Sequence, residues 1–222
     1  MWLHLWQKRE PVSIVEQKSA FEIYTYLKSF DLLKNSPALW WPNAGEFEVV
    51  IGAILTQNTT WKNVEKSLKN LETYLQLDSF LELRESELKE MIRPSGFYNQ
   101  KAPRLLQLSR NIKEEFVTFE NFQHTVSRRW LLAQKGVGEE SADAILCYGC
   151  LRAEMVVDSY TKRLLEEFGI RFQKYGQYKS FLEEGLREHY SEDELFTHFA
   201  HFHGMIVEYN KAKKEKSLKP LH

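Results

Sequence analysis

The sequence predicts an all-α protein. Apolar residues recur at helical spacing through most of the 222 residues, and no alternating β-branched run is followed by a two-residue turn. Hydrophobic residues make up 43% and aromatic residues 14%, which is enough to bury a sizeable core and excludes disorder over most of the chain. At roughly 150 residues per domain, one large domain or two joined lobes would fit this length.

Four amphipathic segments show the helical pattern most clearly. Their apolar stripes run through residues 47–55, 64–75, 105–116 and 195–207. Asn43 with Glu46, and Ser191 with Glu194, have the spacing of caps at helix starts, because both side chains can reach unpaired backbone N–H groups. Asn99 is a further candidate cap, ahead of the third stripe.

The sequence predicts neither a membrane-spanning segment nor a metal site. The longest apolar run, residues 49–55, is roughly a third of a membrane span. The N-terminus has neither a leading cationic segment nor a sustained apolar stretch, so we expect a cytoplasmic protein without a secretory signal. Cys147 and Cys150 are the only cysteines, and no second pair exists to complete a four-thiolate zinc or iron–sulfur site. Two small residues on an apolar helix are the preferred interpretation of this pair.

The charge is balanced overall but unevenly distributed. The formal net charge is −1, yet residues 93–113 hold five basic residues and no acidic one. Residues 211–219 hold five lysines against Glu215, and acidic residues gather between 166 and 194. Locally basic faces can attract phosphate even when the whole molecule is nearly neutral, although a solvated surface is the more common meaning of a charge run.

Residues 130–145 are the most informative segment. A helix is expected to about Gln134, then a tight turn at Gly136-Val137-Gly138, then a second helix from about Glu139. Glycines permit positive φ and close backbone approach, and the N–H groups of such a turn can hold a phosphate. Taken alone, the pattern is equally compatible with an ordinary helix–helix turn.

The segments around this turn resemble the helix-hairpin-helix DNA glycosylases, the superfamily of endonuclease III and the adenine glycosylases. Val157-Asp158 matches the aspartate motif of that family, and residues 55–59 and 96–102 match further segments in the family's order. The likeness runs from about Phe47 to about Phe168. It implies two α-helical lobes with an active-site cleft between them. A continuous lobe would span 44–152, and 1–43 with 153–222 would form the second lobe of a monomer.

Asp158 is the candidate catalytic residue. It precedes a helical pattern, and a helix N-terminus favours the ionised carboxylate. For an aspartate at such a place a simple N-cap is by far the more common explanation, but the hairpin upstream of Asp158 favours catalysis. Breaking an N-glycosidic bond builds positive charge on the sugar. A carboxylate beside that carbon stabilises the charge and can orient or deprotonate the attacking water.

Two departures from endonuclease III narrow the expected activity. Glu140 stands where that enzyme has the lysine that forms a Schiff base, so covalent strand cleavage is not expected. Endonuclease III also carries a cluster on four C-terminal cysteines, and this chain has no cysteine after Cys150. The resemblance therefore implies a monofunctional glycosylase with no iron–sulfur cluster and no other cofactor.

Aromatic residues outside the helical stripes suggest a base pocket. Trp40, Trp41 and Pro42 precede the first stripe, and Trp61 follows the Gln-Asn-Thr-Thr turn. Indole faces attract a flipped, positively charged alkylated purine, although burial as a packed lid is an equal alternative. The arrangement is similar to the bacterial 3-methyladenine DNA glycosylases of the endonuclease III-like branch, whose pocket these positions would line. The family aromatic can be a phenylalanine where this chain has Trp61.

The resemblance also implies a set of DNA contacts. Gln57 matches the residue that fills the gap left by the extruded base, and Phe97 matches an apolar wedge beside the kinked strand. Plain core packing is the alternative for Phe97. Lys101 and Arg104 are expected to contact the DNA backbone. The remaining expected contacts come from the hairpin: Lys135, Gly136, Val137 and Gly138.

Three histidines, His198, His201 and His203, gather in the last helical stripe. The first and second could share a helix face, but His203 would point away from them and no carboxylate or cysteine completes a ligand set. Structural histidines are the preferred interpretation, and no metal site is expected.

These observations predict a monofunctional DNA glycosylase for alkylated purines in double-stranded DNA, foremost 3-methyladenine. A glycosylase for another damaged or mismatched base is the alternative within the same class. A non-catalytic hairpin module that binds damaged DNA would retain all function after Asp158→Asn. An all-α scaffold for protein partners would show no salt-dependent DNA affinity.

Overall fold

The computed structural model describes residues 18–218. In this range all regular secondary structure is helical, and there is no β-strand. The all-α prediction is confirmed. The elements are α1 (Ala20–Lys28), α2 (Glu48–Leu55), α3 (Trp61–Asn70), α4 (Leu77–Leu81), α5 (Glu85–Met91), the 3-10 helix η1 (Arg93–Ser95), α6 (Tyr98–Phe116), α7 (Phe119–Thr125), α8 (Arg128–Leu132), α9 (Glu139–Ala144), the π-helix η2 (Ile145–Gly149), α10 (Ser159–Glu167), α11 (Tyr175–Arg187) and α12 (Glu192–Lys214).

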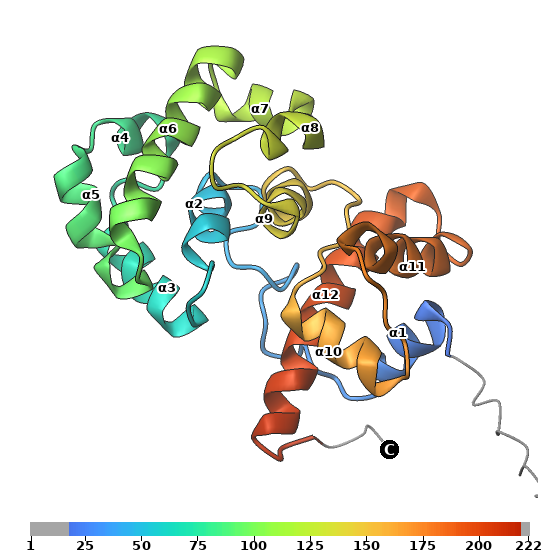
Figure 1. Ribbon diagram of the computed structural model, residues 1–222. Coiled ribbons are helices and arrows are strands. Elements are labelled where there is room, and N and C mark those ends of the chain that lie inside the picture. The colour runs from blue at the N-terminus through green and yellow to red at the C-terminus, as the bar shows by residue number, and fades with distance from the viewer. Residues whose placement is uncertain (1–17, 219–222) are drawn as a thin grey trace, which may run out of the picture.

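The helices form two lobes (Figure 1). Helices α2 to α9 make one lobe, whereas α1 lies with α10, α11 and α12 in the other. Each lobe has its own cluster of buried hydrophobic residues. Along the chain, the buried residues pass from one cluster to the other close to the divisions expected at residues 44 and 152. Trp41, Val156 and Ala200 lie outside 44–152 and nevertheless belong to the first cluster.

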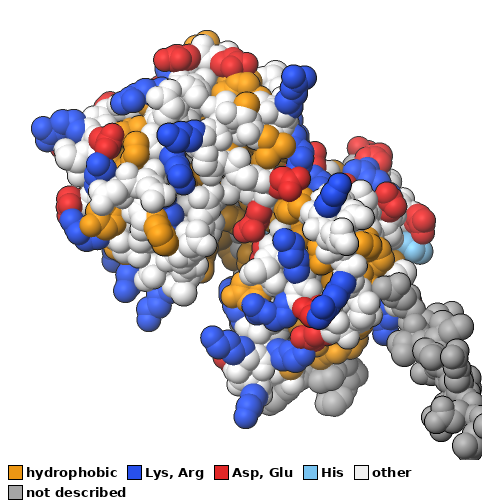
Figure 2. Space-filling model, in the orientation of Figure 1, with side chains coloured by type: hydrophobic (Ala, Val, Ile, Leu, Met, Phe, Trp, Pro, Cys, Tyr) orange, Lys and Arg blue, Asp and Glu red, His pale blue; other side chains and the backbone are white. Residues whose placement is uncertain are grey.

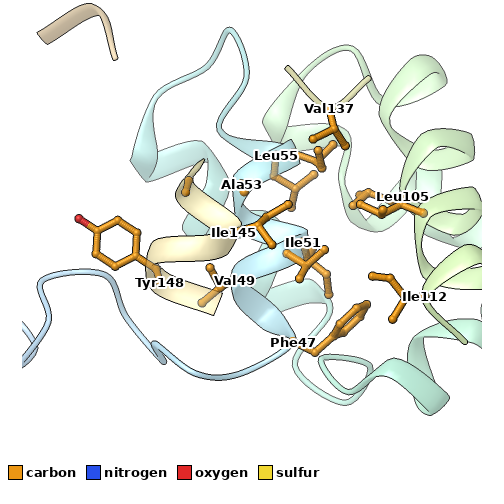
Figure 3. Packing of buried hydrophobic residues seen from close by; sticks show 14 of the residues in the cluster. Phe47, Val49, Ile51, Ala53, Leu55, Leu105, Ile112, Val137, Ile145 and Tyr148 are labelled. Atoms are coloured by element: carbon orange, nitrogen blue, oxygen red, sulfur yellow. The ribbon is translucent and has the colours of Figure 1, made fainter. Parts of the chain in front are cut away.

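Helix α2 is the centre of the first lobe. Every residue from Val49 to Leu55 is buried, because this helix is apolar on all sides and is surrounded by α3, α6, α9 and η2. Figure 3 shows Ile51 and Leu55 packed among Leu105, Ile112 and Ile145. Helices α3 and α6 are amphipathic and bury one face, whereas every residue of η2 is buried.

The expected cap ahead of α2 is wrong. The helix begins at Glu48 with Phe47 as its N-cap, and no side chain caps it. Asn43 instead adopts a positive φ of 52° in the preceding loop and donates to the Glu48 carboxylate at 2.8 Å. Asn99 likewise lies inside α6, whose N-cap is Phe97. The capping box of Ser191 and Glu194 at the start of α12 is present.

A buried charge cluster connects the two lobes. Asp143 of α9 is fully buried and accepts from Arg128 Nε at 2.7 Å and from Lys179 Nζ of α11 at 2.9 Å. Lys179 also pairs with Glu154 in the linker between the lobes and, at 3.6 Å, with Glu183. The interface is therefore held by a buried carboxylate with two cationic partners.

We expect Asp143→Asn to lower the free energy of unfolding by about 3 kcal/mol, because two cations lose their shared buried anion. Urea unfolding monitored by circular dichroism measures this change. Asp78→Asn is the matched control: its ion pair with Lys113 is also short, at 2.7 Å, but the Asp78 side chain is 76% exposed. The control should lose less than about 1 kcal/mol. Equal losses in the two variants would contradict the expected role of Asp143.

Candidate active site between the lobes

Asp158 lies where the linker from the first lobe enters α10. It is the N-cap of this helix, and its Oδ1 accepts from the Thr161 backbone N at 2.7 Å and from Thr161 Oγ1 at 2.9 Å. The other oxygen, Oδ2, lies 3.5 Å from His203 Nε2 of α12. Capping thus occupies one carboxylate oxygen and fixes the side chain, while the second oxygen remains for chemistry.

Several groups act on the ionisation of Asp158. Burial on its own would raise the pKa, but His203 and the hydrogen bonds from Thr161 outweigh it, so the pKa of Asp158 lies below its ordinary value. The N-terminal end of α10 acts in the same direction. The side chain is 14% exposed. Asp158 is therefore an ionised carboxylate with limited access to solvent.

Glu140 belongs to the same cleft. It lies in the first turn of α9 and keeps access to solvent, and the partial burial of its carboxyl group, followed by the charge of Asp158, raises the pKa of this group. Lys162 of α10 is close enough to Glu140 to oppose that shift. The first turn of α9 thus brings a second carboxyl group, that of Glu140, under the influence of Asp158.

The three predicted tryptophans form one aromatic cluster. Trp41 contacts Trp40 and Trp61, with ring centroids 6.2 and 5.4 Å apart, and tilts against Tyr148 at 5.1 Å. Trp41 itself is only 7% exposed and packs on Gly52 of α2. Trp40, Pro42 and Trp61 are half-buried. Lid packing therefore describes Trp41, whereas Trp40 and Trp61 keep part of their surface free.

Trp40 connects this cluster to the second lobe. Its backbone has a positive φ of 68°, and its indole Nε1 donates to Glu208 Oε1 of α12 at 3.0 Å. Its ring lies edge-on to His203 at 5.1 Å. Gly204 makes this approach possible, since a Cβ there would come within 2.5 Å of Trp40 Cγ. The aromatic cluster and Asp158 thus share His203 as a neighbour.

We expect Gly204→Ala to displace Trp40. The added methyl group overlaps the indole, which should cost about 1–3 kcal/mol of folding free energy and lower base release about tenfold or more. Single-turnover kinetics and tryptophan fluorescence measure the two effects. Gly176→Ala is the matched control, because a Cβ at that helical position meets no atom within 4 Å. Unchanged kinetics in Gly204→Ala would show that the position of Trp40 does not matter.

The predicted hairpin is present between α8 and α9. Gly136 has φ +88°, and Gly138 is the N-cap of α9 with no side chain capping the helix. Val137 is buried against the core of the first lobe (Figure 3). Lys135 is exposed beside the turn. Gln57 Nε2 donates to the Gly136 carbonyl and to Ser141 Oγ, both at 2.9 Å, so the Gln57 side chain ties the hairpin to the end of α2.

Phe97 and Lys101 reverse the usual placement of their side-chain types: the apolar residue is exposed and the charged residue is buried. Phe97 is 59% exposed in a left-handed conformation, so the core alternative for this residue is wrong. Lys101 is 2% exposed, and its ammonium donates to the carbonyls of Leu55 and Ser95 at 2.9 Å each. Burial lowers the pKa of Lys101 to about 8. The expected contact of Lys101 with the DNA backbone is therefore wrong; the ammonium instead joins the end of α2 to η1.

The periodicity of α6 could have revealed this burial. Position 101 precedes Leu105, Ser109 and Ile112 by one, two and three turns, so Lys101 continues the buried stripe of its own helix. Arg104 lies off that stripe and is half-buried against Gly136.

Two residues of this site were not predicted as site residues: His203 lies beside Asp158, and Tyr148 contacts His203. His203 was expected to be structural, and Tyr148 lies in the apolar run of η2. His198 and His201 do have structural contacts, with Tyr24 at 2.7 Å and with the Ala38 carbonyl at 2.7 Å. Among the residues that the structure describes, no three His, Cys, Asp or Glu side chains converge as metal ligands. Cys147 and Cys150 are buried, and burial raises the pKa of Cys150 to about 12.

The surface between the two lobes is hollowed, with hydrophobic and acidic side chains beside the hollow (Figure 2).

None of the helices within residues 18–218 has the length and apolar character needed to cross a bilayer. The catalytic candidate, the aromatic cluster and the hairpin are thus presented by a molecule built of two packed lobes.

The sequence of this chain matches a known protein family. Residues 51–188 match the HhH-GPD superfamily of base excision DNA repair proteins. The chain belongs to this superfamily. It is a DNA glycosylase, and DNA is its partner. The expected family is thereby confirmed.

Relatives of this glycosylase include proteins with stated substrates. A protein named as a DNA repair glycosylase in Methanocaldococcus jannaschii is 41% identical, over 78% of this chain and 80% of its own length. The structure of the 3-methyladenine DNA glycosylase of H. pylori, bound to 1,N6-ethenoadenine, is 47% identical with a TM-score of 0.84. That match covers 88% of this chain and 99% of the other.

Endonuclease III shares the fold at greater distance. Its trapped covalent intermediate with DNA matches 86% of each chain with a TM-score of 0.65 at 19% identity. This likeness shows that the two proteins share the all-α architecture.

Proposed function

We propose that this glycosylase is monofunctional and releases alkylated purines, foremost 3-methyladenine, from double-stranded DNA. The observation that carries the proposal is the ionised carboxylate of Asp158 across His203 from the tryptophan cluster, with Glu140 in place of an amine. The substrate named for the H. pylori enzyme, 47% identical to this chain, supports the same class of base.

The proposed reaction needs no strong acid. A purine nucleotide methylated at N3 is already positively charged, so the C1′–N bond breaks with its electron pair moving to the base, which leaves as neutral 3-methyladenine. Positive charge then develops on the sugar, where Asp158 Oδ2 stabilises it. A water molecule adds its oxygen to C1′ and gives a proton to Asp158, which passes it to solvent. The products are the free base and an abasic site.

The tryptophans and nearby carboxylates would favour a cationic base. Trp40 and Trp61 keep partly free indole surfaces, and a positive charge over an indole face is stabilised by about 0.5–2 kcal/mol. The Glu208 carboxylate holds Trp40 through its indole N–H. A neutral, undamaged purine would gain less from each of these groups.

DNA binding would use the hairpin and the exposed turn before α6. The backbone N–H groups at Gly136 to Gly138 would hold a phosphate, with Lys135 beside them. Phe97 would enter the duplex as a wedge, since it is already exposed at the start of α6. Gln57 would fill the gap left by the flipped base. The amide nitrogen of Gln57 holds the hairpin here, so this role requires the side chain to exchange partners.

We further propose that the enzyme acts as a monomer in the cytoplasm and needs no metal or iron–sulfur cluster. Activity measured after dialysis against a chelator should equal that of the untreated protein. A loss that added metal restores would contradict this proposal.

The deciding experiment is single-turnover release of bases from defined duplexes. The panel contains 3-methyladenine, 1,N6-ethenoadenine, uracil and a G·T mismatch, with borohydride added to parallel samples. We expect 3-methyladenine to be released fastest and no trapped complex to form. Release of uracil or thymine alone would assign another base. A trapped complex would mean that an amine acts as nucleophile. Salt-dependent binding without release would reduce the chain to a damage-binding module.

A further inference from the structure

His203 has an unusual position for a buried polar side chain. It is 3% exposed on α12, between the two lobes. Its Nδ1 lies 2.8 Å from the Tyr148 hydroxyl, and its Nε2 is buried with no hydrogen-bond partner within normal distance. That unpartnered nitrogen faces Asp158 Oδ2 at 3.5 Å.

The hydrogen bonds of Tyr148 determine where the imidazole carries protons. The Tyr148 hydroxyl donates to the Ala200 carbonyl at 3.0 Å, and a carbonyl can only accept. A hydroxyl has one proton to donate, so with that proton on the Ala200 carbonyl its second contact, with His203 Nδ1, has Nδ1–H as the donor. Figure 3 shows the Tyr148 oxygen pointing out of the apolar cluster, as this arrangement needs.

With Nδ1–H as the donor, the carboxylate of Asp158 at 3.5 Å favours a proton on the other imidazole nitrogen as well. If Nδ1 carried the only proton, the lone pair of Nε2 would face the carboxylate of Asp158, which is repulsive in a buried setting. With both nitrogens protonated, Nε2–H points at Asp158 and the pair is a buried cation beside an anion. A closure of a few tenths of an ångström would make this contact a hydrogen bond.

We propose that His203 is an imidazolium, held by Tyr148, and that it is a positioning residue for Asp158. The inference rests on the proposed function, in which Asp158 is catalytic. His203 would keep the carboxylate charged and fix its rotation, since Thr161 holds Oδ1 and His203 flanks Oδ2. The free lone pair of Oδ2 is then directed at one place in the cleft.

The charged groups around His203 suit a cation. Asp158 at the start of α10 and Glu140 of α9 are the carboxyl groups that face it, and Tyr148 of η2 supplies the acceptor. Lys162 of α10 acts on Glu140. On α12 itself, Glu208 is paired with Lys211 at 2.7 Å. His203 therefore compensates Asp158, and its own ring is edge-on to Trp40.

A pH dependence follows from the sign of this interaction. His203 lowers the pKa of Asp158, and the charged Asp158 is the active form. Without the cation, Asp158 would take up a proton at higher pH, so activity would be lost earlier as the pH falls. At neutral pH, the loss should be smaller, because Asp158 would still be charged.

The first test is the ¹⁵N NMR spectrum of His203 in the intact protein, assigned by comparison with His203→Gln. We expect both ring nitrogens to show protonated shifts at about pH 7. In Asp158→Asn and in Tyr148→Phe, one nitrogen should become unprotonated, because the imidazolium loses its anion or its acceptor. An unprotonated nitrogen in the native protein at this pH would overturn the proposal.

The second test is the pH profile of single-turnover base release. His203→Gln keeps a neutral donor near Asp158 but removes the charge. We expect its rate at about pH 5 to fall at least about tenfold relative to its own rate at about pH 7.5, against less than about threefold for the native enzyme. His201→Gln is the matched control on the same helix, since the ring of His201 hydrogen-bonds to the Ala38 carbonyl and not to Asp158 or Tyr148. Parallel profiles for His203→Gln and native enzyme would overturn the role of His203.

The two tests separate the inference from the proposed function. A native protein that releases no alkylated base but shows a doubly protonated His203 would refute the proposed substrate and leave the ion pair intact. Normal base release with a singly protonated His203 would refute the positioning role alone. If His203→Gln does not fold, the Tyr148→Phe profile decides, because that variant removes only a hydroxyl group; its acid loss should also exceed that of the native enzyme.

Discussion

Asp158→Asn is expected to lower single-turnover release of 3-methyladenine by about 10³-fold or more, while affinity for the lesion duplex changes by less than about threefold. Asparagine retains one side-chain oxygen, which can still cap α10 and accept from Thr161. It cannot carry the negative charge that stabilises the sugar cation, and it cannot take a proton from water. The change therefore removes the chemistry while preserving the fold.

Quench-flow measurement of free base tests the expected loss of rate, and thermal unfolding tests whether the fold is preserved. Asp193→Asn is the matched control, since Asp193 is an exposed acid in the first turn of α12. It should retain native rates. If Asp158→Asn released base within about tenfold of the native rate, the catalytic role of this carboxylate would be refuted. If it failed to bind the duplex, Asp158 would be a structural cap and the rate would say nothing of chemistry.

Gly136→Ala is expected to lower the free energy of unfolding by about 1–2 kcal/mol and the affinity for duplex DNA by about tenfold. Gly136 has φ +88°, a conformation that an alanine adopts only with strain, and the new Cβ would lie 2.5 Å from Arg104 Cδ. Arg104 would have to move, and the carbonyl that Gln57 holds would move with the turn. The hairpin would then no longer present its N–H groups in one fixed arrangement.

Urea unfolding and fluorescence anisotropy at several salt concentrations test this expectation. Gly138→Ala is the control for stability, because Gly138 has φ −94° and ψ 180° and a Cβ there meets no atom within 4 Å. It should unfold like the native protein within about 0.5 kcal/mol. Native affinity in Gly136→Ala, or an equal loss of stability in Gly138→Ala, would mean that the left-handed turn is not what the hairpin requires.

The fold class and the main elements could be predicted from the sequence because they depend on neighbours along the chain. The stripes of α6 and α12, the capping box at Ser191 and the hairpin glycines are all local features. A local pattern can also mislead, and the predicted start of α2 was wrong. Asn43 and Glu46 have cap spacing, but the loop turns at Asn43 and the helix begins only at Glu48.

The wrong prediction for Lys101 and the unforeseen contact of His203 with Asp158 have one physical origin. Lysine was assigned to the surface by its charge, yet two backbone carbonyls from elements distant in sequence replace its water. His203 was assigned to structure because it points away from His198 and His201 on α12. That same direction places it against Asp158 and Tyr148 of other elements. A residue's position on its helix therefore did not reveal its partners.

The sequence alone determined the helical fold, the glycine hairpin, the helix-capping aspartate and the membership of a DNA glycosylase superfamily. These properties follow from spacing within a few turns of one chain segment, where periodicity and backbone preference act. Only the tertiary structure decided that Trp40, His203 and Asp158 meet between the lobes and that Lys101 is buried. Those contacts depend on which helix faces pack together, and packing is selected by the shape and burial of the whole core rather than by any local pattern.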